Sequence, residues 1–441
     1  MALKSDMAKK VIKRIEEERE ENIRFLQELV KIPSISGKIE EGKAQEIVLK
    51  KLREINNLKI DIWEPDLKEL EKYPLNPIRL SEWSYKNRPN IVGTIKGSGH
   101  GKSLILNGHI DVVSPEPIMA WKHDPWKGEI KGGKLYGRGS LDCKAGIAAM
   151  IYAVKCVQDV GVKLKGDVIL ESVVDEELGG GGTIATILKG YKADAAIVTE
   201  PTGSRYVQIG FCGNRWCNIK ILGRSGHAGG AYHGINAIDL AVNIYNSLME
   251  LDERRCAELK GKHPIFEMPM AGQIWGRRPT GITVGVLRAG DWPTTTAGMA
   301  ELTIRIGFPP SERGEDVMKQ VEDTVKNISK QNEWINKHPP KIEWFGSRKE
   351  GYELNPESPI VQTLKYNIEN VSGRNCELYG ACVSSDANHL GVKIGDYGGI
   401  PTICYGPGGA NAHAADEFVI LKEVITVTKV LSLTIMDWCG Y

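Results

Sequence analysis

The sequence predicts an α/β protein built on a mixed, mostly parallel sheet with helices on both faces, into which a smaller α+β unit is inserted. Short apolar segments typical of buried strands alternate with helical segments between residues 90 and 199. After Pro201 the strands become longer and antiparallel, and the alternation returns near Gly351. A chain of 441 residues also exceeds the size at which one hydrophobic core usually stops growing. We therefore expect a larger domain in two parts, residues 1–204 and 349–441, and an inserted domain, residues 205–348.

The individual elements follow from hydrophobic periodicity. Phe25 and Leu29 belong to an apolar series at helical spacing that Pro33 ends, which predicts a long first helix. Continuous apolar runs such as Ser-Leu-Ile-Leu favour strands covered on both faces. Residues 63–89 carry several prolines and no period, so we expect a long loop there. The expected helices are 8–30, 43–55, 145–157, 182–188, 236–250, 314–329 and 358–371, and the expected strands are 90–95, 103–107, 166–174, 193–199, 206–223, 282–307 and 400–405.

Composition excludes several classes of function. The formal net charge is +1, so the overall balance favours neither nucleic acid nor an anionic membrane surface as a partner. The polar first residues do not resemble a secretory signal, and no apolar run approaches the length of a membrane span. Nine scattered cysteines without a CxxC pair are typical of reduced thiols. We therefore expect a cytoplasmic protein.

The first chemical motif is His109 with Asp111, directly after an apolar strand. Ligands gather at the carboxyl ends of strands in open α/β sheets. A histidine there can bind a metal ion through one ring nitrogen while a carboxylate holds the other nitrogen. His-x-Asp is common by chance, so a structural role is favoured when this motif is taken alone.

The second motif is a glycine-rich turn that brings Asp142 to the start of a helix. A helix N-cap explains Asp142 equally simply. The third motif, Asp175-Glu176-Glu177, ends a strand beside the glycine run 179–182. Of two adjacent carboxylates, one could bind metal and the other could take a proton from water, although acids at strand ends are often only solvated.

Glu200 and His413 complete the series, each following a further apolar strand, and each is ordinary alone. Together, the strand ends offer two imidazoles and several carboxylates, a ligand set that suits zinc and also cobalt or manganese. Five ligands exceed what one open catalytic ion needs. One bridging carboxylate would place two ions about 3.5–4 Å apart, as in two-metal hydrolases.

In the order of these motifs the sequence resembles the M20 metallopeptidase family, which includes acetylornithine deacetylase, succinyl-diaminopimelate desuccinylase and aminoacylase-1. The resemblance covers nearly the whole chain and implies a role for each residue. Asp142 would bridge two divalent metal ions, and its peptide bond to Cys143 would be cis. Glu176 would be the general base, with Asp111 orienting a ligand histidine. The implied metal ligands are His109, Asp142, Glu177, Glu200 and His413.

The resemblance extends to the inserted unit, which is similar to the family's lid and dimerisation domain. It implies a homodimer in which His227 reaches the partner subunit's active site and stabilises the oxyanion. Arg305 lies in a stretch where the family binds a substrate carboxylate, and an exposed strand residue is an equal alternative. The stretch Asp291-Trp292-Pro293 lacks the paired Asn of the desuccinylases and resembles the acetylornithine deacetylase-like branch.

The resulting expectation is a dinuclear amidohydrolase that removes an acyl group from an N-acyl amino acid or related amine. Its cations would be Zn²⁺ first, with Co²⁺ or Mn²⁺ as alternatives. A dipeptidase or carboxypeptidase would share the same catalytic core. A ligand-binding protein without activity is a further alternative, against which the intact ligand set and Glu176 argue. A nucleotide site at residues 179–182 lacks the required glycine spacings.

Overall fold

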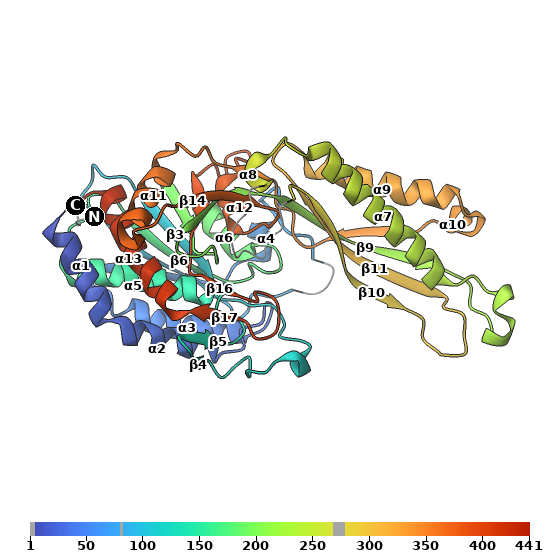
Figure 1. The fold of residues 1–441 in the computed structure, drawn as a ribbon, viewed down its shortest axis with the longest axis horizontal. Helices are drawn as coiled ribbons and strands as arrows, with labels where there is room; N and C mark the ends of the chain where they lie inside the picture. The colour runs from blue at the N-terminus through green and yellow to red at the C-terminus, as the bar shows by residue number, and fades with distance from the viewer. Residues whose placement is uncertain (1–4, 80–82, 268–277) are drawn as a thin grey trace.

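The computed structural model describes residues 5–79, 83–267 and 278–441. It shows two domains side by side, the larger one containing both ends of the chain and the inserted one extending away from it (Figure 1). The expected fold class is confirmed: the large domain is a mixed sheet with helices, and the inserted domain is α+β. Among the described residues, no helix combines the length and the apolar character that crossing a bilayer requires.

The large domain is organised around a nine-stranded sheet in the order β1-β2-β6-β3-β7-β15-β8-β13, with β14 paired to β8. The central strands β6, β3, β7 and β15 are parallel, whereas β1 and β2 join antiparallel at one edge. Parallel neighbours end at the same edge of a sheet, so their polar end residues meet. The strands are β1 (Leu58–Trp63), β2 (Asn90–Ile95), β3 (Leu104–His109), β6 (Val168–Val173), β7 (Ala195–Val198), β8 (Tyr206–Phe211), β13 (Tyr352–Glu353), β14 (Glu377–Ala381) and β15 (Thr402–Cys404).

Helices cover both faces of this sheet, as adjacent residues of β3 show. Gly108 faces Ile147 of α5, while the Asn107 side chain donates to Thr183 Oγ1 of α6 on the opposite face. The helices of the large domain are α1 (Asp6–Glu17), α2 (Arg19–Val30), α3 (Glu40–Leu52), α4 (Leu67–Leu70), α5 (Lys144–Asp159), α6 (Gly181–Leu188), α8 (Pro264–Glu267), α11 (Pro359–Ser372), α12 (Asp386–Gly391) and α13 (Leu421–Cys439).

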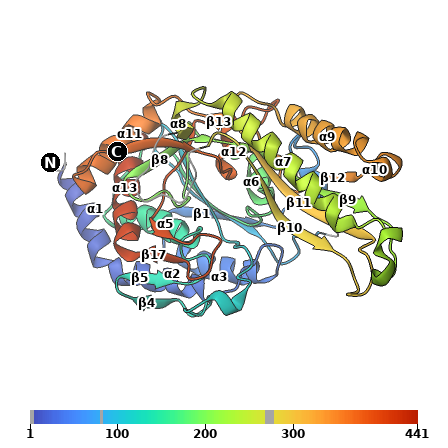
Figure 2. The ribbon, with the colours of Figure 1, turned by 45° about the vertical axis from the view of Figure 1, so that its right-hand side comes forward.

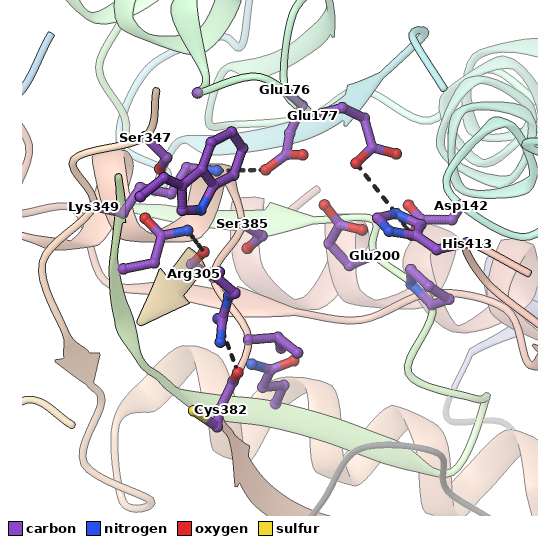
Figure 3. Close-up of a pocket in the computed structure, with 17 residues that line it drawn as sticks. Asp142, Glu176, Glu177, Glu200, Arg305, Ser347, Lys349, Cys382, Ser385 and His413 are labelled. Atoms are coloured by element: carbon purple, nitrogen blue, oxygen red, sulfur yellow. Dashed lines mark hydrogen bonds and ion pairs between the residues drawn. The ribbon is translucent and has the colours of Figure 1, made fainter. Parts of the chain in front are cut away.

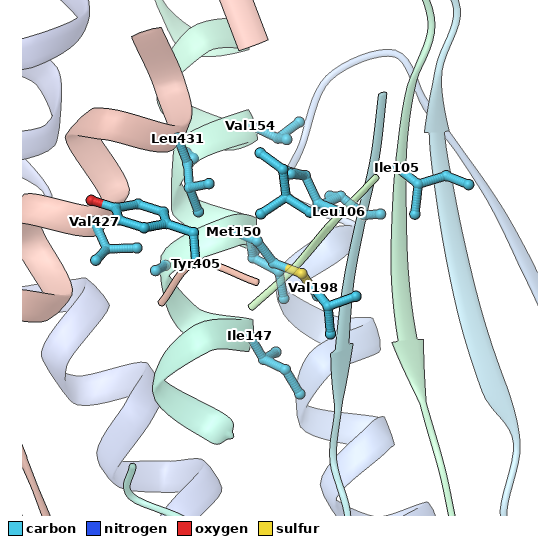
Figure 4. Packing of buried hydrophobic residues seen from close by; sticks show 14 of the residues in the cluster. Ile105, Leu106, Ile147, Met150, Val154, Val198, Tyr405, Val427 and Leu431 are labelled. Atoms are coloured by element: carbon cyan, nitrogen blue, oxygen red, sulfur yellow. The ribbon is translucent and has the colours of Figure 1, made fainter. Parts of the chain in front are cut away.

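The main core lies between the sheet and helices α5 and α13 (Figure 4). Leu106 of β3 and Met150 of α5 are fully buried there, as is Leu431 of α13. Burial of each such side chain stabilises the fold by roughly 1.5–3 kcal/mol. This packing fixes the end of β3 and the start of α5, the two places from which His109 and Asp142 project.

The inserted domain is an antiparallel sheet in the order β10-β11-β9-β12, with α7 and α9 packed on the same side of it (Figure 2). Its own apolar cluster joins those helices to one face of the sheet. The other face turns toward the large domain. The elements are β9 (Gly213–Leu222), α7 (Ala237–Leu259), β10 (Gly281–Ala289), β11 (Met299–Phe308), α9 (Gly314–Lys330), α10 (Glu333–Lys337) and β12 (Lys341–Phe345).

Several sequence expectations need correction. The expected helix 8–30 is two helices that meet at Glu18, whose ψ of 1° is not helical. The expected strand 206–223 divides at Cys212 into β8, which joins the large sheet, and β9, which joins the inserted one. The expected loop 63–89 contains α4 and begins with the last residue of β1. The remaining short elements are the 3₁₀ turns η1 (Ile118–Ala120) and η2 (Ala228–His233) and the small sheet of β4 (Glu129–Lys131), β5 (Lys134–Tyr136), β16 (Gly409–Ala410) and β17 (Phe418–Ile420).

Candidate metal centre and active site

The five residues singled out as metal ligands lie together at the carboxyl edge of the large sheet. Figure 3 shows four of them, Asp142, Glu177, Glu200 and His413. His109 is the last residue of β3, and Glu177 and Glu200 follow its neighbours β6 and β7. Asp142 immediately precedes α5, and His413 lies in the loop between β16 and β17. Chain positions more than 300 residues apart therefore converge on one cluster.

Asp142 occupies the centre of this cluster. Its Oδ1 lies 3.1 Å from His109 Nε2, and its Oδ2 lies 3.4 Å from His413 Nε2. Glu200 Oε1 is 3.7 Å from His109 Nε2, and Glu177 Oε2 is 3.2 Å from His413 Nε2. Each oxygen of Asp142 thus faces a different imidazole and carboxylate pair.

The donor set fits divalent cations. Imidazole nitrogen with carboxylate oxygen is the ligand chemistry of catalytic zinc and related ions. Ligand atoms of His109, Asp142 and Glu177 all lie within 4.8 Å of one another. Oε1 of Glu177 is buried and has no hydrogen-bond partner among the described residues, so it is free to bind a cation.

The cluster concentrates charge, with four largely buried members, and only the His413 side chain is half exposed, at 50%. Burial and the nearby charge of Asp142 raise the pKa of Glu200 to about 8. Burial also opposes ionisation of Asp142, but hydrogen bonds from His109 and His413 lower its pKa. The charge of Glu177 raises the pKa of His413 well above its usual range. Glu200 and His413 therefore carry protons until cations replace them, whereas Asp142 is ionised.

Zinc binding is expected to release protons and to strengthen as the pH rises toward 8. With a pKa of about 8, Glu200 is protonated at neutral pH in the metal-free protein, and a cation binds only its carboxylate form. Calorimetric titration with Zn²⁺ in buffers of different ionisation heat measures the released protons. The Glu200→Gln variant should release fewer. Equal release by both proteins would contradict this assignment.

Asp111 holds the loop that carries the two glutamates. Its Oδ1 accepts from the backbone N–H of Glu176 at 3.0 Å, and its Oδ2 accepts from that of Glu177 at 3.1 Å. The Ser36 hydroxyl donates to the same Oδ2 at 2.7 Å. Nδ1 of His109 lies closer to the Asp111 carbonyl oxygen (2.9 Å) than to its carboxylate (3.6 Å). Asp111 thus contacts the histidine mainly through its backbone.

A second buried carboxylate, Glu417, organises the turn that presents Asp142. It accepts from the backbone N–H groups of Gly139, Leu141 and Asp142 at 2.9–3.1 Å. It also pairs with the buried Arg138 at 2.5 Å. The peptide bond between Asp142 and Cys143 is cis, as the resemblance implied. Sequence analysis did not single out Glu417, because one acid near a strand gives no signal of its own.

Glu176 lies beside the cluster and forms an ion pair that the sequence did not reveal. Lys349 Nζ is 2.5 Å from Glu176 Oε1, and both side chains are nearly inaccessible. Burial opposes the charged lysine, yet the charges of Glu176 and Asp386 raise the pKa of Lys349. Lys349 is one of several charged residues in its stretch, and only the fold shows that it points inward.

A cavity of about 460 Å³ lies between the two domains (Figure 3), and Glu176, Lys349 and four of the proposed metal ligands line it. The metal cluster and Glu176 form one end of it, and residues of the inserted sheet form the other. Asn214 and Trp216 are two positions apart on β9, so their side chains lie on the same face of the strand and both border the cavity. Asn214 Oδ1, Trp216 Nε1 and Ser347 Oγ are buried and lack hydrogen-bond partners among the described residues. The period of two residues in β9 was the sequence signal that could have predicted that Asn214 and Trp216 share one face.

Arg305 and His227 occupy different places. Arg305 lies in β11 opposite Trp216 and lines the cavity, where one of its N–H groups donates to the Cys382 carbonyl at 3.0 Å. His227 is exposed on the inserted domain and is not among the cavity-lining residues. Its Nδ1 accepts from the Gly229 N–H at 3.0 Å. The structure of one chain thus brings Arg305 to the site and leaves His227 outside it.

A cavity that joins a buried set of metal ligands to an adjacent carboxylate defines the class of metal-dependent hydrolases. Comparison with known proteins agrees: residues 105–437 match the model of peptidase family M20/M25/M40. The chain is 31% identical over 374 residues to the N-formyl-4-amino-5-aminomethyl-2-methylpyrimidine deformylase of Halalkalibacterium halodurans, covering 80% of this chain and 84% of that protein. It is 32% identical over 382 residues to the deformylase of the same name from Bacillus subtilis, covering 82% and 86%.

Among solved structures, the dipeptidase Dug1p of Saccharomyces cerevisiae superimposes with a TM-score of 0.78 at 16% identity, over 98% of this chain and 99% of that one. At that identity the likeness concerns the fold. The chain belongs to peptidase family M20/M25/M40. It is a metal-dependent hydrolase of linear amide bonds, and the alternative of a binding protein without activity is set aside.

Proposed function

We propose that this enzyme removes a small acyl group from an N-acyl amino acid or related amine, using two divalent cations. The observation that carries the proposal is the arrangement of Asp142 between two imidazole and carboxylate pairs, with Glu176 on the same cavity. Zinc is the proposed cation, with cobalt or manganese as alternatives, because mixed nitrogen and oxygen ligands suit all three. A cytoplasmic location is also proposed, because nine cysteines without a CxxC pair are typical of reduced thiols.

When bound, the cations would acidify water and polarise the amide carbonyl. The residues of the chain would do the rest. His109 and Glu200 would hold one cation, His413 and Glu177 the other, and Asp142 both. Glu176 would take a proton from the attacking water and deliver it to the leaving amine.

The two deformylases at 31% and 32% identity support a small acyl group. The relatives do not single out acetylornithine. The test is a panel of N-formyl, N-acetyl and N-succinyl derivatives of amino acids and of aminomethylpyrimidine, assayed with Zn²⁺, Co²⁺ and Mn²⁺ in turn. We expect the formyl or acetyl members to be hydrolysed fastest. Turnover of none of them would overturn the proposal.

Peptidase activity is the second candidate, and the match to peptidase family M20/M25/M40 favours it. The Arg305 guanidinium donates to the Cys382 carbonyl and interacts with the Cys382 thiol, and its other N–H groups remain for a substrate carboxylate. A dipeptide would present that carboxylate at the correct end of the cavity. Including dipeptides in the panel separates the two candidates, and the substitution Arg305→Met tests carboxylate binding in both.

We also propose a homodimer formed through the inserted domain. Strand β10 is an edge strand of its sheet, and the apolar side chains Ile238, Val242 and Tyr245 of α7 are about two-fifths exposed. An unpaired edge and an exposed apolar stripe on adjoining elements are typical of a subunit interface. The His227 imidazole would then complete the site of the partner subunit.

Co-expression of two inactive variants is expected to restore activity if His227 acts across the interface. His227→Ala removes the imidazole and Glu176→Gln removes the base, so each homodimer lacks one group in both sites. A mixed dimer has one site with both groups. Activity should therefore appear in the mixed sample, purified with two different tags. Continued inactivity of the mixed dimer would place His227 outside the mechanism.

A further inference from the structure

Lys349 stands apart from the residues that the family resemblance identified, because it joins the proposed base to the junction between the domains. It lies in the second connection between them, after β12 and before β13. Its carbonyl accepts from the Asn214 backbone N–H at 2.9 Å and from the Arg215 guanidinium at 3.0 Å, both at the start of β9. The backbone of Lys349 is therefore fixed to the inserted domain while its side chain enters the large one.

The side chain makes one ion pair. Within the described parts of the chain, Glu176 is the only carboxylate within 4.0 Å of Lys349 Nζ, at 2.5 Å. The lysine side chain is 3% exposed and that of Glu176 is 9% exposed. A salt bridge so poorly hydrated holds its partners far more rigidly than a surface pair does.

The two oxygens of Glu176 consequently differ. Oε1 is occupied by Lys349, and the backbone N–H of the residue is held by Asp111. No hydrogen bond to Oε2 is found among the described residues, and Glu176 borders the cavity. Oε1 is therefore fixed by the lysine, while Oε2 is available to water in the cavity.

We propose that Lys349 is a positioning residue that fixes Oε1 of Glu176 and so aims Oε2 at the cavity for proton transfer. This inference rests on the proposed role of Glu176 as proton carrier. It also implies that the orientation of the inserted domain governs the base, because Lys349 moves with the start of β9. Proton transfer is efficient only when the carboxylate oxygen lies within hydrogen-bond reach of the proton.

The test is the substitution Lys349→Met, assayed with the fastest substrate of the N-acyl amine panel. We expect kcat to fall roughly 100-fold, while KM changes less than about threefold and the metal content stays that of the parent protein. Lys349→Arg should recover part of kcat, because it restores a cation at the same oxygen. Saturable rescue of Lys349→Ala by ethylammonium, but not of Glu176→Gln, would confirm that the missing group is the cation.

The matched control is Lys155→Met. Lys155 is also largely buried and pairs with Asp159 at 2.8 Å, but in α5 and away from the cavity. It should keep the parent kcat. If Lys349→Met raises KM with kcat unchanged, the lysine binds substrate instead and the proposal is wrong.

A crystal structure of Lys349→Met tests the proposal without turnover. The Glu176 carboxylate should leave its present position, and an unmoved carboxylate would overturn the inference. Failure of the proposed function can be distinguished from failure of the role of Lys349. An active Glu176→Gln variant would show that Glu176 is not the base. An inactive Glu176→Gln beside a fully active Lys349→Met would reject only the role of Lys349.

Discussion

Replacing Glu176 by Gln is expected to lower kcat by roughly 10²–10⁴-fold, the range that a positioned general base contributes. Glutamine has nearly the same shape and keeps a hydrogen-bonding oxygen, but it cannot take a proton from water. The loss should appear in kcat and kcat/KM together, because the interaction acts in the transition state. Steady-state kinetics with the best N-acyl substrate measure both values.

The neighbouring substitution Glu177→Gln is the matched control for this result. It changes an adjacent carboxylate that faces His413 rather than Lys349. Metal content measured by mass spectrometry should fall in Glu177→Gln and remain unchanged in Glu176→Gln. Substantial turnover by the Glu176 variant, or loss of its metal, would end the assignment of Glu176 as base.

Replacing Glu417 by Ala is expected to lower the free energy of unfolding by roughly 3–5 kcal/mol, as is usual when one partner of a buried ion pair is removed. The substitution leaves the guanidinium of Arg138 buried without its carboxylate and strips three backbone N–H groups of their acceptor. Those N–H groups belong to the turn that holds Asp142. Urea denaturation measures the stability, and Zn²⁺ titration should show weaker binding.

The control is the double substitution Arg138→Met with Glu417→Leu. Apolar replacement of a buried ion pair is often neutral or stabilising. The double variant should therefore be more stable than Glu417→Ala, although its turn still lacks an acceptor and its metal affinity stays low. If Glu417→Ala alone unfolds at the parent urea concentration, the turn does not depend on this carboxylate.

The sequence predicted that the proposed metal ligands would lie together because they share one local signature. Glu200 and His109, for example, each follow an apolar strand, and parallel strands that pair must end together. That rule needs no knowledge of the tertiary packing. The order of strands in the sheet, by contrast, depends on the path of the helical connections between them. No short stretch of sequence determines that path.

The missed residues lack such a signature. Lys349 follows Arg348 and precedes Glu350, and only the tertiary fold decides which of these charged side chains is buried. Helix α13 was not predicted, because its first half is rich in β-branched residues such as Ile425, Val427 and Thr428, which favour strands. Strand β1 was missed although Lys59 and Asp61 alternate with apolar residues, which is the pattern of an edge strand with one exposed face.

The late position of the loop between β16 and β17 has a consequence for biosynthesis. A ribosome adds about 5–20 residues per second, so roughly 15–60 s separate the appearance of Asp111 from that of His413. During this interval the nascent chain has its early acids but neither His413 nor Glu417, which completes the turn around Asp142. With the proposed ligand set, the half-made protein lacks one metal ligand, so we expect hydrolysis to begin only after His413 has emerged and docked.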